Sequence, residues 1–250
     1  MENFYDRVAK KFGGYAFGSS KTKAKKEYPS QDPEEVFKTK LVDLAGKDKK
    51  ALDIGCGDGK FAFEIAANFG HIQGIDNSVE LIKIALTKKN TLEVDNVDFK
   101  IEDASTISFS DGSFDIAFCR RGPGFYKEYY RVLKNAGYYL EIGIGEQDCV
   151  DVKKMFGRGQ NYGEWDSPRL LKDKDQFVRI GFKVIFAEDF IYNEYYDSIE
   201  ALNDFLQGVP IFEDFDSEKD KSNLESYCKR FEGKKGILLP RHRVVYVVQK

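Results

Sequence analysis

A glycine-rich run, Asp53 to Lys60, holds the residues whose types and spacing are best suited to binding a ligand. It reads Asp-Ile-Gly-Cys-Gly-Asp-Gly-Lys, after an apolar run typical of a strand and before a helical pattern. Its three glycines let the backbone turn sharply and let a ligand approach where a β-carbon would collide. The spacing G-x-G-x-G differs from the G-x-G-x-x-G of dinucleotide sites, and Asp58 stands where a pyrophosphate would be repelled. The run therefore predicts a site for a ligand without phosphate.

Two more carboxylates follow at the ends of the next two apolar runs. Asp76 lies 21 residues after Gly55, where an acidic side chain accepts hydrogen bonds from both hydroxyls of a ribose. Asp103, followed by Ala104, is placed to accept from an adenine amino group. Each carboxylate alone is more often a solvated loop residue, and Asn77 is also a natural helix cap. Three at consecutive strand ends indicate a site for an adenosine-like ligand.

The elements that position these residues alternate between β-rich runs and amphipathic helical patterns. This alternation predicts an α/β, Rossmann-like fold: a seven-stranded, mostly parallel sheet with helices on both faces. Ligands of such sheets bind at the carboxyl ends of the strands. The predicted strands are 51–54, 72–75, 97–101, 114–119, 138–144, 182–190 and 244–248, and the predicted helices are 3–12, 32–46, 60–69, 79–88, 125–133, one opening at Ser167 and 218–231.

We expect residues 1–250 to form a single domain. It divides into N-terminal helices with a lysine-bearing flap or loop (1–46), a cofactor-binding core (47–190), a cap inserted before the last strand (191–241) and that strand (242–250). The cap is rich in aromatic and acidic residues. A lid that shuts water out of the site and a dimer interface both explain it, and the oligomeric state stays open.

Composition disfavours several other classes of function. The 250 residues carry 39 Lys and Arg against 42 Asp and Glu, a net charge of −3, which disfavours nucleic acid and anionic membrane as partners. We find no apolar run long enough to span a bilayer and no signal peptide, and therefore expect a cytoplasmic protein. Four widely spaced cysteines and two histidines predict no metal site and no disulfide framework.

At this point the sequence resembles the class I S-adenosylmethionine-dependent methyltransferases, within them the ubiquinone/menaquinone-biosynthesis-like (type 11) group. The resemblance covers roughly residues 5–190. It rests on 52–59 and 74–76, on Asp103-Ala104 followed by 109–115, on Glu128 with 131–134 and Gly137, and on an opening Tyr5-Asp6-Arg7-Val8-Ala9. These motifs are specific for fold and cofactor, and say little about the methyl acceptor.

The resemblance implies a role for each matching residue. The backbone at Gly55, Cys56 and Gly57, with Asp53 nearby, would hold the methionine part of S-adenosylmethionine. Asp76 would take the ribose hydroxyls, Asn77 would flank the adenine, Asp103 would bind its amine and Ala104 would lie beside the ring. The full set of expected cofactor residues is Asp53, Gly55, Cys56, Gly57, Gly59, Asp76, Asn77, Asp103, Ala104 and Cys119.

The end of the fourth strand, Cys119-Arg120-Arg121-Gly122, would border both cofactor and acceptor. The Asn/Asp-Pro-Pro-Tyr/Phe signature of methyltransferases that act on nucleobase and glutamine amines is replaced there by Arg-Arg-Gly-Pro-Gly. Two guanidiniums suit a carboxylate or phosphate of the acceptor, and pairing with Glu141, Glu146 or Asp148 is the alternative. The spacing around Tyr126 favours packing of its helix onto the sheet, with stacking of a planar acceptor as the alternative.

Methyl transfer from a sulfonium needs alignment and desolvation, and a general base only where the nucleophile must lose a proton. Weak candidates for such a base are His242, Glu141 and Glu146. We therefore expect a methyltransferase that acts on an anionic small molecule. The alternatives are an RNA methyltransferase that binds the backbone through N-terminal lysines, Arg241 and Arg243, a noncatalytic S-adenosylmethionine-binding protein, and, more distantly, a nicotinamide-dependent oxidoreductase.

Overall fold

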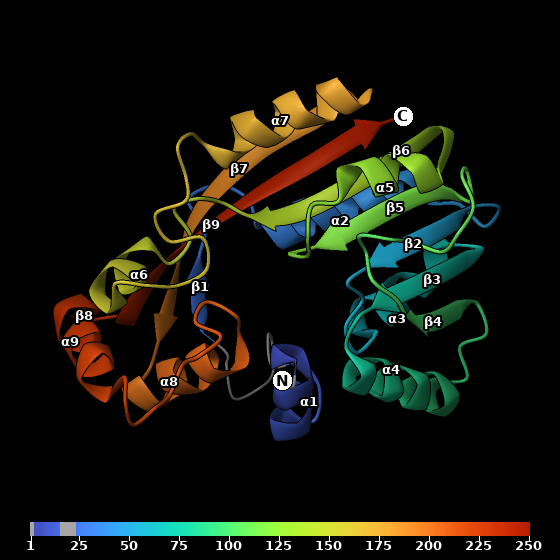
Figure 1. The fold of residues 1–250 in the computed structure, drawn as a ribbon. Helices are drawn as coiled ribbons and strands as arrows, with labels where there is room; N and C mark the ends of the chain where they lie inside the picture. The colour runs from blue at the N-terminus through green and yellow to red at the C-terminus, as the bar shows by residue number, and fades with distance from the viewer. Residues whose placement is uncertain (1–2, 16–23) are drawn as a thin grey trace.

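A twisted sheet runs through the molecule in the computed structural model, which describes residues 3–15 and 24–250 (Figure 1). Within these residues the sheet has nine strands, ordered β1-β7-β9-β6-β5-β2-β3-β4, with β8 paired to β9 alone. The pairs from β4 to β6 are parallel, and β9 runs antiparallel to both β6 and β7. The predicted seven-stranded, mostly parallel sheet is therefore confirmed, with β1 and β8 as short additions.

The strands of the sheet are β1 (Lys25–Glu27), β2 (Lys50–Ile54), β3 (His71–Asp76), β4 (Val97–Ile101), β5 (Phe114–Arg120), β6 (Leu133–Ile144), β7 (Lys183–Tyr196), β8 (Glu232–Gly233) and β9 (Gly236–Gln249). Side chains along β5 are almost all buried, as expected for a central strand covered on both faces. Because β2, β3, β4 and β5 run parallel, their carboxyl ends meet at one edge of the sheet, and these ends carry the sequence motifs.

The helices are α1 (Phe4–Phe12), α2 (Pro33–Leu44), α3 (Lys60–Ile65) with the short 3-10 turn η2 (Ala66–Asn68), α4 (Val79–Leu92), α5 (Tyr126–Val132), α6 (Val150–Phe156), α7 (Arg169–Ile180), α8 (Ile199–Gly208) and α9 (Lys221–Phe231). Two begin as the sequence predicts, because the side chain of Asp32 accepts from the backbone N–H of Glu34 and that of Ser78 from Leu81. Such caps satisfy backbone donors that have no partner within the helix.

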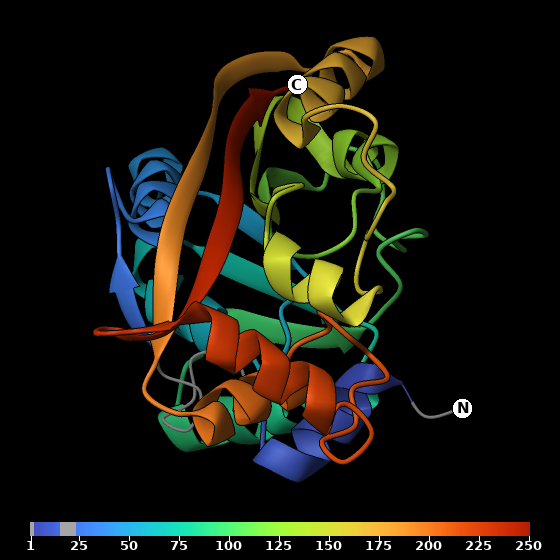
Figure 2. The same cartoon turned by 90° about the vertical axis from the view of Figure 1, so that its left-hand side faces the viewer.

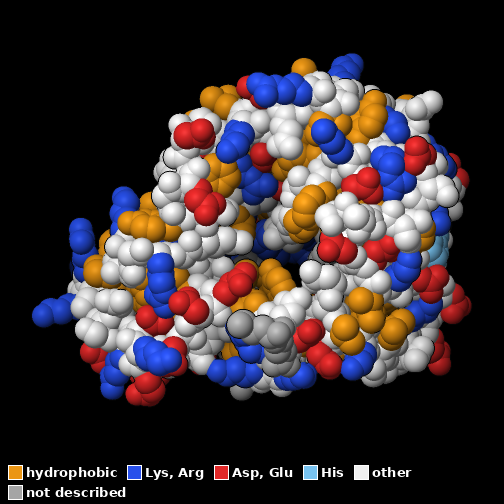
Figure 3. Space-filling model, in the orientation of Figure 1, with side chains coloured by type: hydrophobic (Ala, Val, Ile, Leu, Met, Phe, Trp, Pro, Cys, Tyr) orange, Lys and Arg blue, Asp and Glu red, His pale blue; other side chains and the backbone are white. Residues whose placement is uncertain are grey.

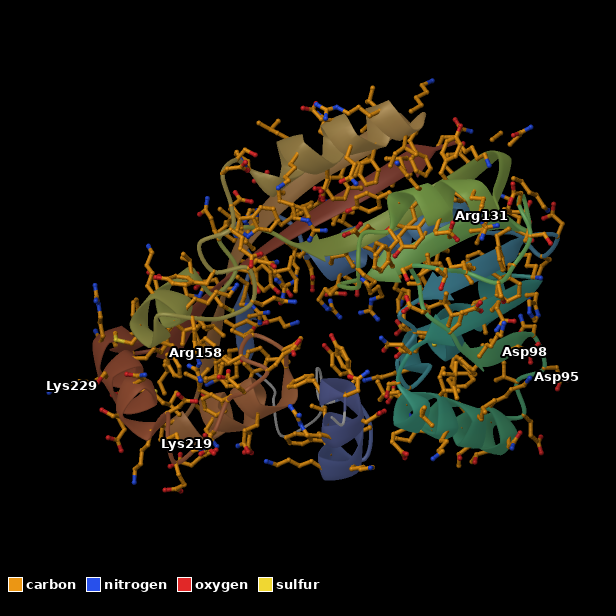
Figure 4. All side chains as sticks on the ribbon, viewed as in Figure 1. Asp95, Asp98, Arg131, Arg158, Lys219 and Lys229 are labelled. Carbon is orange, nitrogen blue, oxygen red and sulfur yellow. The ribbon has the colours of Figure 1, made fainter. Side chains whose placement is uncertain are left out.

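Two hydrophobic cores, one on each face, hold the sheet between its helices. On one face Phe37, Phe61 and Ile82 come from α2, α3 and α4, and on the other Tyr129 and Phe177 come from α5 and α7. Arg131 braces the second layer. Its guanidinium donates to the backbone oxygens of Ile107 and Phe109 and pairs with Asp111 and Glu128 (Figure 4). The sequence motifs that contain Asp111, Glu128 and Arg131 thus hold the loop between β4 and β5 in place.

Strands β7 and β9 are far longer than predicted. Each has 14 residues, and their pairing runs from Lys183 opposite Gln249 to Tyr196 opposite Ile237. The expected cap limits, 191 and 241, fall inside these strands, so the placement of those limits between strand and cap is wrong. The far halves of both strands extend past the sheet and carry a third core with α6, α8 and α9 (Figures 1 and 2).

The cap region is braced by its own ion pairs. Arg158, just after α6, donates to both carboxylate oxygens of Asp220 and to Asp214 (Figure 4). The segment 157–168, which includes Trp165, connects α6 to α7. Of the predicted lysine-bearing flap, Lys21 and Lys23 lie outside the described residues, whereas Lys25 is in β1 and pairs with Asp197 of the cap region.

Helix α1 lies apart from the main layers (Figure 1) and contacts both α4 and α8. One oxygen of Asp6 accepts from the Ser78 hydroxyl (2.5 Å) and from the backbone N–H of Glu80 (3.2 Å), at the N-terminus of α4. Arg7 donates to the backbone oxygen of Glu213. Helix α1 therefore bridges the sheet and the cap. Among residues 3–15 and 24–250 no helix has the length and apolar character needed to cross a membrane.

Candidate active site

A cavity of about 370 Å³ opens at the carboxyl ends of β2, β3 and β5. We call it the cofactor cavity. It brings together six of the predicted cofactor residues: Gly55, Gly57, Asp76, Asn77, Asp103 and Ala104. A second cavity of about 450 Å³, the α2 cavity, adjoins it and is lined by Asp53 and Cys56. Figure 3 shows the molecule hollowed at its centre, with basic side chains inside the hollow.

The glycine-rich turn leaves open space facing the cofactor cavity. Gly55 and Gly57 have φ angles of +71° and +56°, in the left-handed region that favours glycine. A β-carbon at Gly55 would have no atom within 4 Å, and one at Gly57 would meet only Leu81, at 4.0 Å. The backbone N–H groups of Gly55 and Cys56 donate to the carbonyl of Ile75, which fixes this turn against β3.

Asp76 lies at the end of β3 and joins the two predicted motifs. Its Oδ2 accepts from the backbone N–H of Gly57 (2.9 Å) and its Oδ1 from that of Ser78 (2.9 Å). Each carboxylate oxygen has a second lone pair for a ligand hydroxyl. Burial is the main cause that raises the pKa of this group, and these backbone donors oppose it. The geometry suits a carboxylate that accepts two ligand hydroxyls.

Asp103 serves a local turn as well as the cavity. Its Oδ1 accepts from the backbone N–H of Ser105 at 2.8 Å, a bond that lowers the pKa of the Asp103 carboxyl. The carboxylate lines the cofactor cavity beside Ala104. Asp58, expected to repel a pyrophosphate, is instead paired with Lys88 of α4 at 2.5 Å, so its charge is compensated and carries little weight against phosphate.

Gly59, Cys119 and Tyr126 do not line the cofactor cavity. Gly59 is the N-cap of α3 with φ +75°, and a β-carbon there would lie 2.6 Å from the Phe99 ring, so close packing explains the glycine. Cys119 is completely buried in the core between the sheet and α5, and burial raises the pKa of its thiol. Tyr126 is buried against Phe177, as its helical spacing predicts. Tyr126 also lines a different cavity, next to α7.

Arg120 and Arg121 lie where predicted, at the end of β5, and both line the cofactor and α2 cavities. Their carboxylate partner is Glu34 of α2. Arg120 Nη2 lies 2.8 Å from Glu34 Oε2, and Arg121 Nη1 contacts Oε1. The two guanidiniums hold the pKa of Glu34 well below its usual range, against the effect of burial. Pairing with Glu141, Glu146 or Asp148, the alternative from the sequence, is wrong.

Comparison with known proteins agrees with this arrangement. Residues 45–166 match a protein family described as a methyltransferase domain. Phosphoethanolamine N-methyltransferase 1 of Arabidopsis thaliana is 34% identical over 100 residues, which are 37% of this chain and 20% of the relative. The 2-methyl-6-phytyl-1,4-hydroquinone methyltransferase of Synechocystis sp. is 31% identical over 148 residues, 55% of this chain and 43% of the relative.

Among solved structures, a Bacillus halodurans C-125 protein provisionally described as a methyltransferase shares the fold. The TM-score is 0.65 at 17% identity, over 87% of this chain and 99% of that one. Residues 45–166 of this chain carry a methyltransferase domain of the class I, S-adenosylmethionine-dependent kind. The family predicted from the motifs is confirmed. The chain spans less than half the length of both curated relatives named above.

S-adenosylmethionine is the cofactor of this family, and the described residues fit it. The open space at Gly55 and Gly57 leaves room for the ligand backbone, and the lone pairs of Asp76 suit ribose hydroxyls. Asp53, in the adjoining α2 cavity, is 3% exposed, and burial raises the pKa of its carboxyl to about 7, with Arg120 acting against the rise. An ammonium group of the ligand would stabilise its ionised form.

The three candidate bases of this methyltransferase do not line the cofactor cavity or the α2 cavity. Glu141 is fully buried and pairs with Arg169 at 2.5 Å. Glu146 accepts from the backbone N–H of Arg169. His242 is buried between Glu146 and Asp189, and its Nδ1 accepts from the backbone N–H of Gln147. Burial lowers the pKa of His242, which favours its neutral form. A surface role for His242 is excluded.

Three side chains of the methyltransferase site were missed by the sequence patterns: Tyr5, Tyr15 and Glu34. Tyr5 and Tyr15 line the cofactor cavity and their rings lie 6.0 Å apart, so the N-terminal segment forms one wall. The opening motif that contains Tyr5 was the only signal for this. Glu34 also has a role in the N-terminal turn of α2, where an acidic residue is unremarkable, so no local pattern identified it.

Proposed function

We propose that this chain transfers the methyl group of S-adenosylmethionine to a small-molecule acceptor that carries an anionic group, in the cytoplasm. The observation that supports an anionic acceptor is the Arg120–Arg121 pair beside the cofactor cavity. Both guanidiniums contact Glu34 and both still line the cofactor cavity. Four buried free thiols are typical of a reducing compartment. Among the relatives, phosphoethanolamine N-methyltransferase has an anionic substrate in its name.

When bound, the cofactor supplies an electrophilic methyl carbon, which bonds to the acceptor's lone pair as its bond to sulfur breaks and that electron pair stays on sulfur. The chain's own residues position the partners and exclude water. Asp76 and Asp103 would orient the adenosine end and Asp53 the methionine end. Tyr5 and Tyr15 cover the cavity from the side of α1. Any acceptor proton would pass to solvent or to a base on the acceptor itself.

The RNA alternative loses the arginines on which it was based. Arg241 and Arg243 are 3% and 0% exposed, and both pair with Asp148. Their guanidiniums are therefore inaccessible to a phosphate backbone. Lys25, on the N-terminal side, is paired with Asp197. What supports a small acceptor is the size of the cofactor cavity, about 370 Å³, at the carboxyl ends of the strands.

The first test is calorimetric titration of the purified chain with S-adenosylmethionine, S-adenosylhomocysteine and NADH. We expect the first two to bind and NADH not to bind. Radiolabelled methyl transfer to phosphoethanolamine, other anionic metabolites and total RNA then identifies the acceptor class. Tight binding of NADH alone would overturn the cofactor, and methyl incorporation into RNA alone would overturn the small-molecule acceptor.

Asp53 predicts a pH dependence of cofactor affinity. Its pKa is raised to about 7 in the free chain, and a bound ammonium lowers it, so binding releases a proton near neutral pH. Affinity then rises with pH, by about eightfold between pH 6 and 7.5 for a single such group. Calorimetry in buffers of different ionisation enthalpy measures the proton release. Asp53→Asn should remove both effects, and an unchanged pH profile in that variant would reject this role.

A further inference from the structure

A third cavity adjoins the cofactor cavity. It has a volume of about 340 Å³, and we call it the α7 cavity because Arg169, Lys172, Asp173 and Gln176 of that helix line it. It shares three consecutive residues with the cofactor cavity, Arg121 to Pro123. This segment after β5 is therefore a wall common to both cavities, next to the strand end where the reacting methyl group is expected.

The common wall is built from strained backbone. Arg121 has a φ angle of +62°, which costs a residue other than glycine about 1 kcal/mol or more. Its backbone N–H donates to Ile142 on the neighbouring strand at 2.8 Å, and its guanidinium contacts Glu34. Arg121 lines the cofactor, α2 and α7 cavities alike. Backbone strain of this kind clusters at sites of function, and here it places one side chain at the junction of all three.

The lining of the α7 cavity is polar. Arg169 has its donors committed, to Glu141, Asp173 and the backbone oxygen of Ile144. Lys172 differs, because its side chain is 53% exposed and its one carboxylate neighbour among the ion pairs of the described residues, Asp166, lies 4.0 Å away. Three amide side chains complete the polar surface: Gln160, Asn161 and Gln176.

An aromatic side chain closes the same cavity. Trp165 lines it from the segment before α7, and the Lys172 ammonium lies 5.7 Å from the centre of its ring. Trp165 comes from the segment before α7 and Lys172 from α7 itself. Together they give one side of the cavity a planar apolar surface next to a cation. Such a pair suits a ligand in which an anionic group lies close to a part that packs on an aromatic face, whether that part is apolar or a cation.

We propose that the α7 cavity is the acceptor site and binds a small polar molecule with a phosphate or carboxylate group, which Lys172 pairs while the Trp165 ring packs on the rest of the molecule. This inference rests on the proposed function. It separates two kinds of acceptor named among the relatives, since a cavity of about 340 Å³ with mainly polar lining residues suits phosphoethanolamine and has little apolar surface for a long phytyl chain.

The chain's one tryptophan makes the test direct, because Trp165 is the sole source of tryptophan emission. With the full-length chain saturated in S-adenosylhomocysteine, we expect phosphoethanolamine to change that emission saturably. Inorganic phosphate and sarcosine serve as arms that separate a phosphate from a carboxylate requirement, and methylhydroquinone as the uncharged arm. Lys172→Ala should weaken the responding probe about tenfold, with the affinity for S-adenosylhomocysteine unchanged.

Lys174→Ala is the matched control. Lys174 lies on the same helix, about 200° around it from Lys172, and carries the same charge, so its loss should leave probe binding within twofold. If both variants weakened probe binding equally, the effect would come from the loss of any positive charge on α7, and the assignment of Lys172 would be overturned. No emission change with any anionic probe, while S-adenosylhomocysteine still binds, would overturn the acceptor site and leave the proposed function standing. Failure of S-adenosylhomocysteine itself to bind would reject the proposed function.

Discussion

Asp76→Ala should weaken binding of S-adenosylmethionine and S-adenosylhomocysteine by about 100-fold to 10,000-fold. The carboxylate accepts from Gly57 and Ser78 and keeps lone pairs for two ribose hydroxyls. Hydrogen bonds to a charged group contribute about 1.5–3 kcal/mol each, and each 1.4 kcal/mol is a factor of ten in affinity. Loss of the contact to Gly57 also loosens the glycine-rich turn. Isothermal titration calorimetry measures both affinities.

Asp98→Asn is the control for this experiment. Asp98 is an exposed carboxylate on β4, near the outer edge of the sheet (Figure 4), and pairs with Lys89 rather than facing the cofactor cavity. Its neutralisation removes one negative charge and should leave cofactor affinity within twofold. If Asp76→Ala retains wild-type affinity while its thermal unfolding is unchanged, the ribose contact is wrong and the orientation assigned to the cofactor with it.

The strand-end motifs could be predicted because they depend on short-range patterns. Gly55, Asp76 and Asp103 each follow a run of β-rich residues, and parallel strands bring their carboxyl ends to one edge. The order of the elements therefore suffices to place the three residues around one cavity, which is where they lie. Residues that serve packing were harder to distinguish by sequence from residues that contact the ligand, as Gly59 and Cys119 show. Their sequence context matches the motif, whereas Gly59 is enclosed by Phe99 and Cys119 by the core.

Contacts over long sequence separations could not be predicted. Glu34 and Arg120 are 86 residues apart, and nothing local to α2 indicates that its first turn faces the end of β5. The length of β7 and β9 could not be predicted either, because it depends on contacts between buried charges that are distant in the sequence. Glu194, Arg241 and Arg243 occupy buried positions of these strands, so the alternation of apolar and polar residues that marks a strand is broken by charged side chains that point inward.

Two of those buried charges, Arg241 and Arg243, share Asp148, which lies between β6 and α6. Its Oδ1 accepts from Arg241 Nε at 2.9 Å, from Arg243 Nη1 at 2.6 Å and from the backbone N–H of His242 at 3.0 Å. Arg241 also pairs with Glu194, whereas Arg243 has Asp148 as its one ion-pair partner among the described residues. The two arginines hold the pKa of Asp148 far below its usual range, against burial.

Asp148→Asn should therefore destabilise the fold by about 3–5 kcal/mol, the usual cost of removing one partner from a buried ion pair. Guanidinium chloride unfolding measures this. Asp214→Asn is the control, because Asp214 is 74% exposed in its pair with Arg158, and such surface pairs contribute under about 1 kcal/mol. Because the folded-state pKa of Asp148 is lowered, its contribution is present above the unfolded pKa, near 4, and is lost as the pH falls.

The Asp148→Asn variant should accordingly lose part of the acid-induced decline in stability that the wild-type chain shows below pH 4. If it does not fold, Asp148→Asn combined with Arg243→Met provides the second measurement. Removing both charges leaves Arg241 paired with Glu194 and no uncompensated guanidinium, so the double variant should be more stable than the single one. A double variant no more stable than Asp148→Asn alone would show that Arg243 is not what Asp148 neutralises.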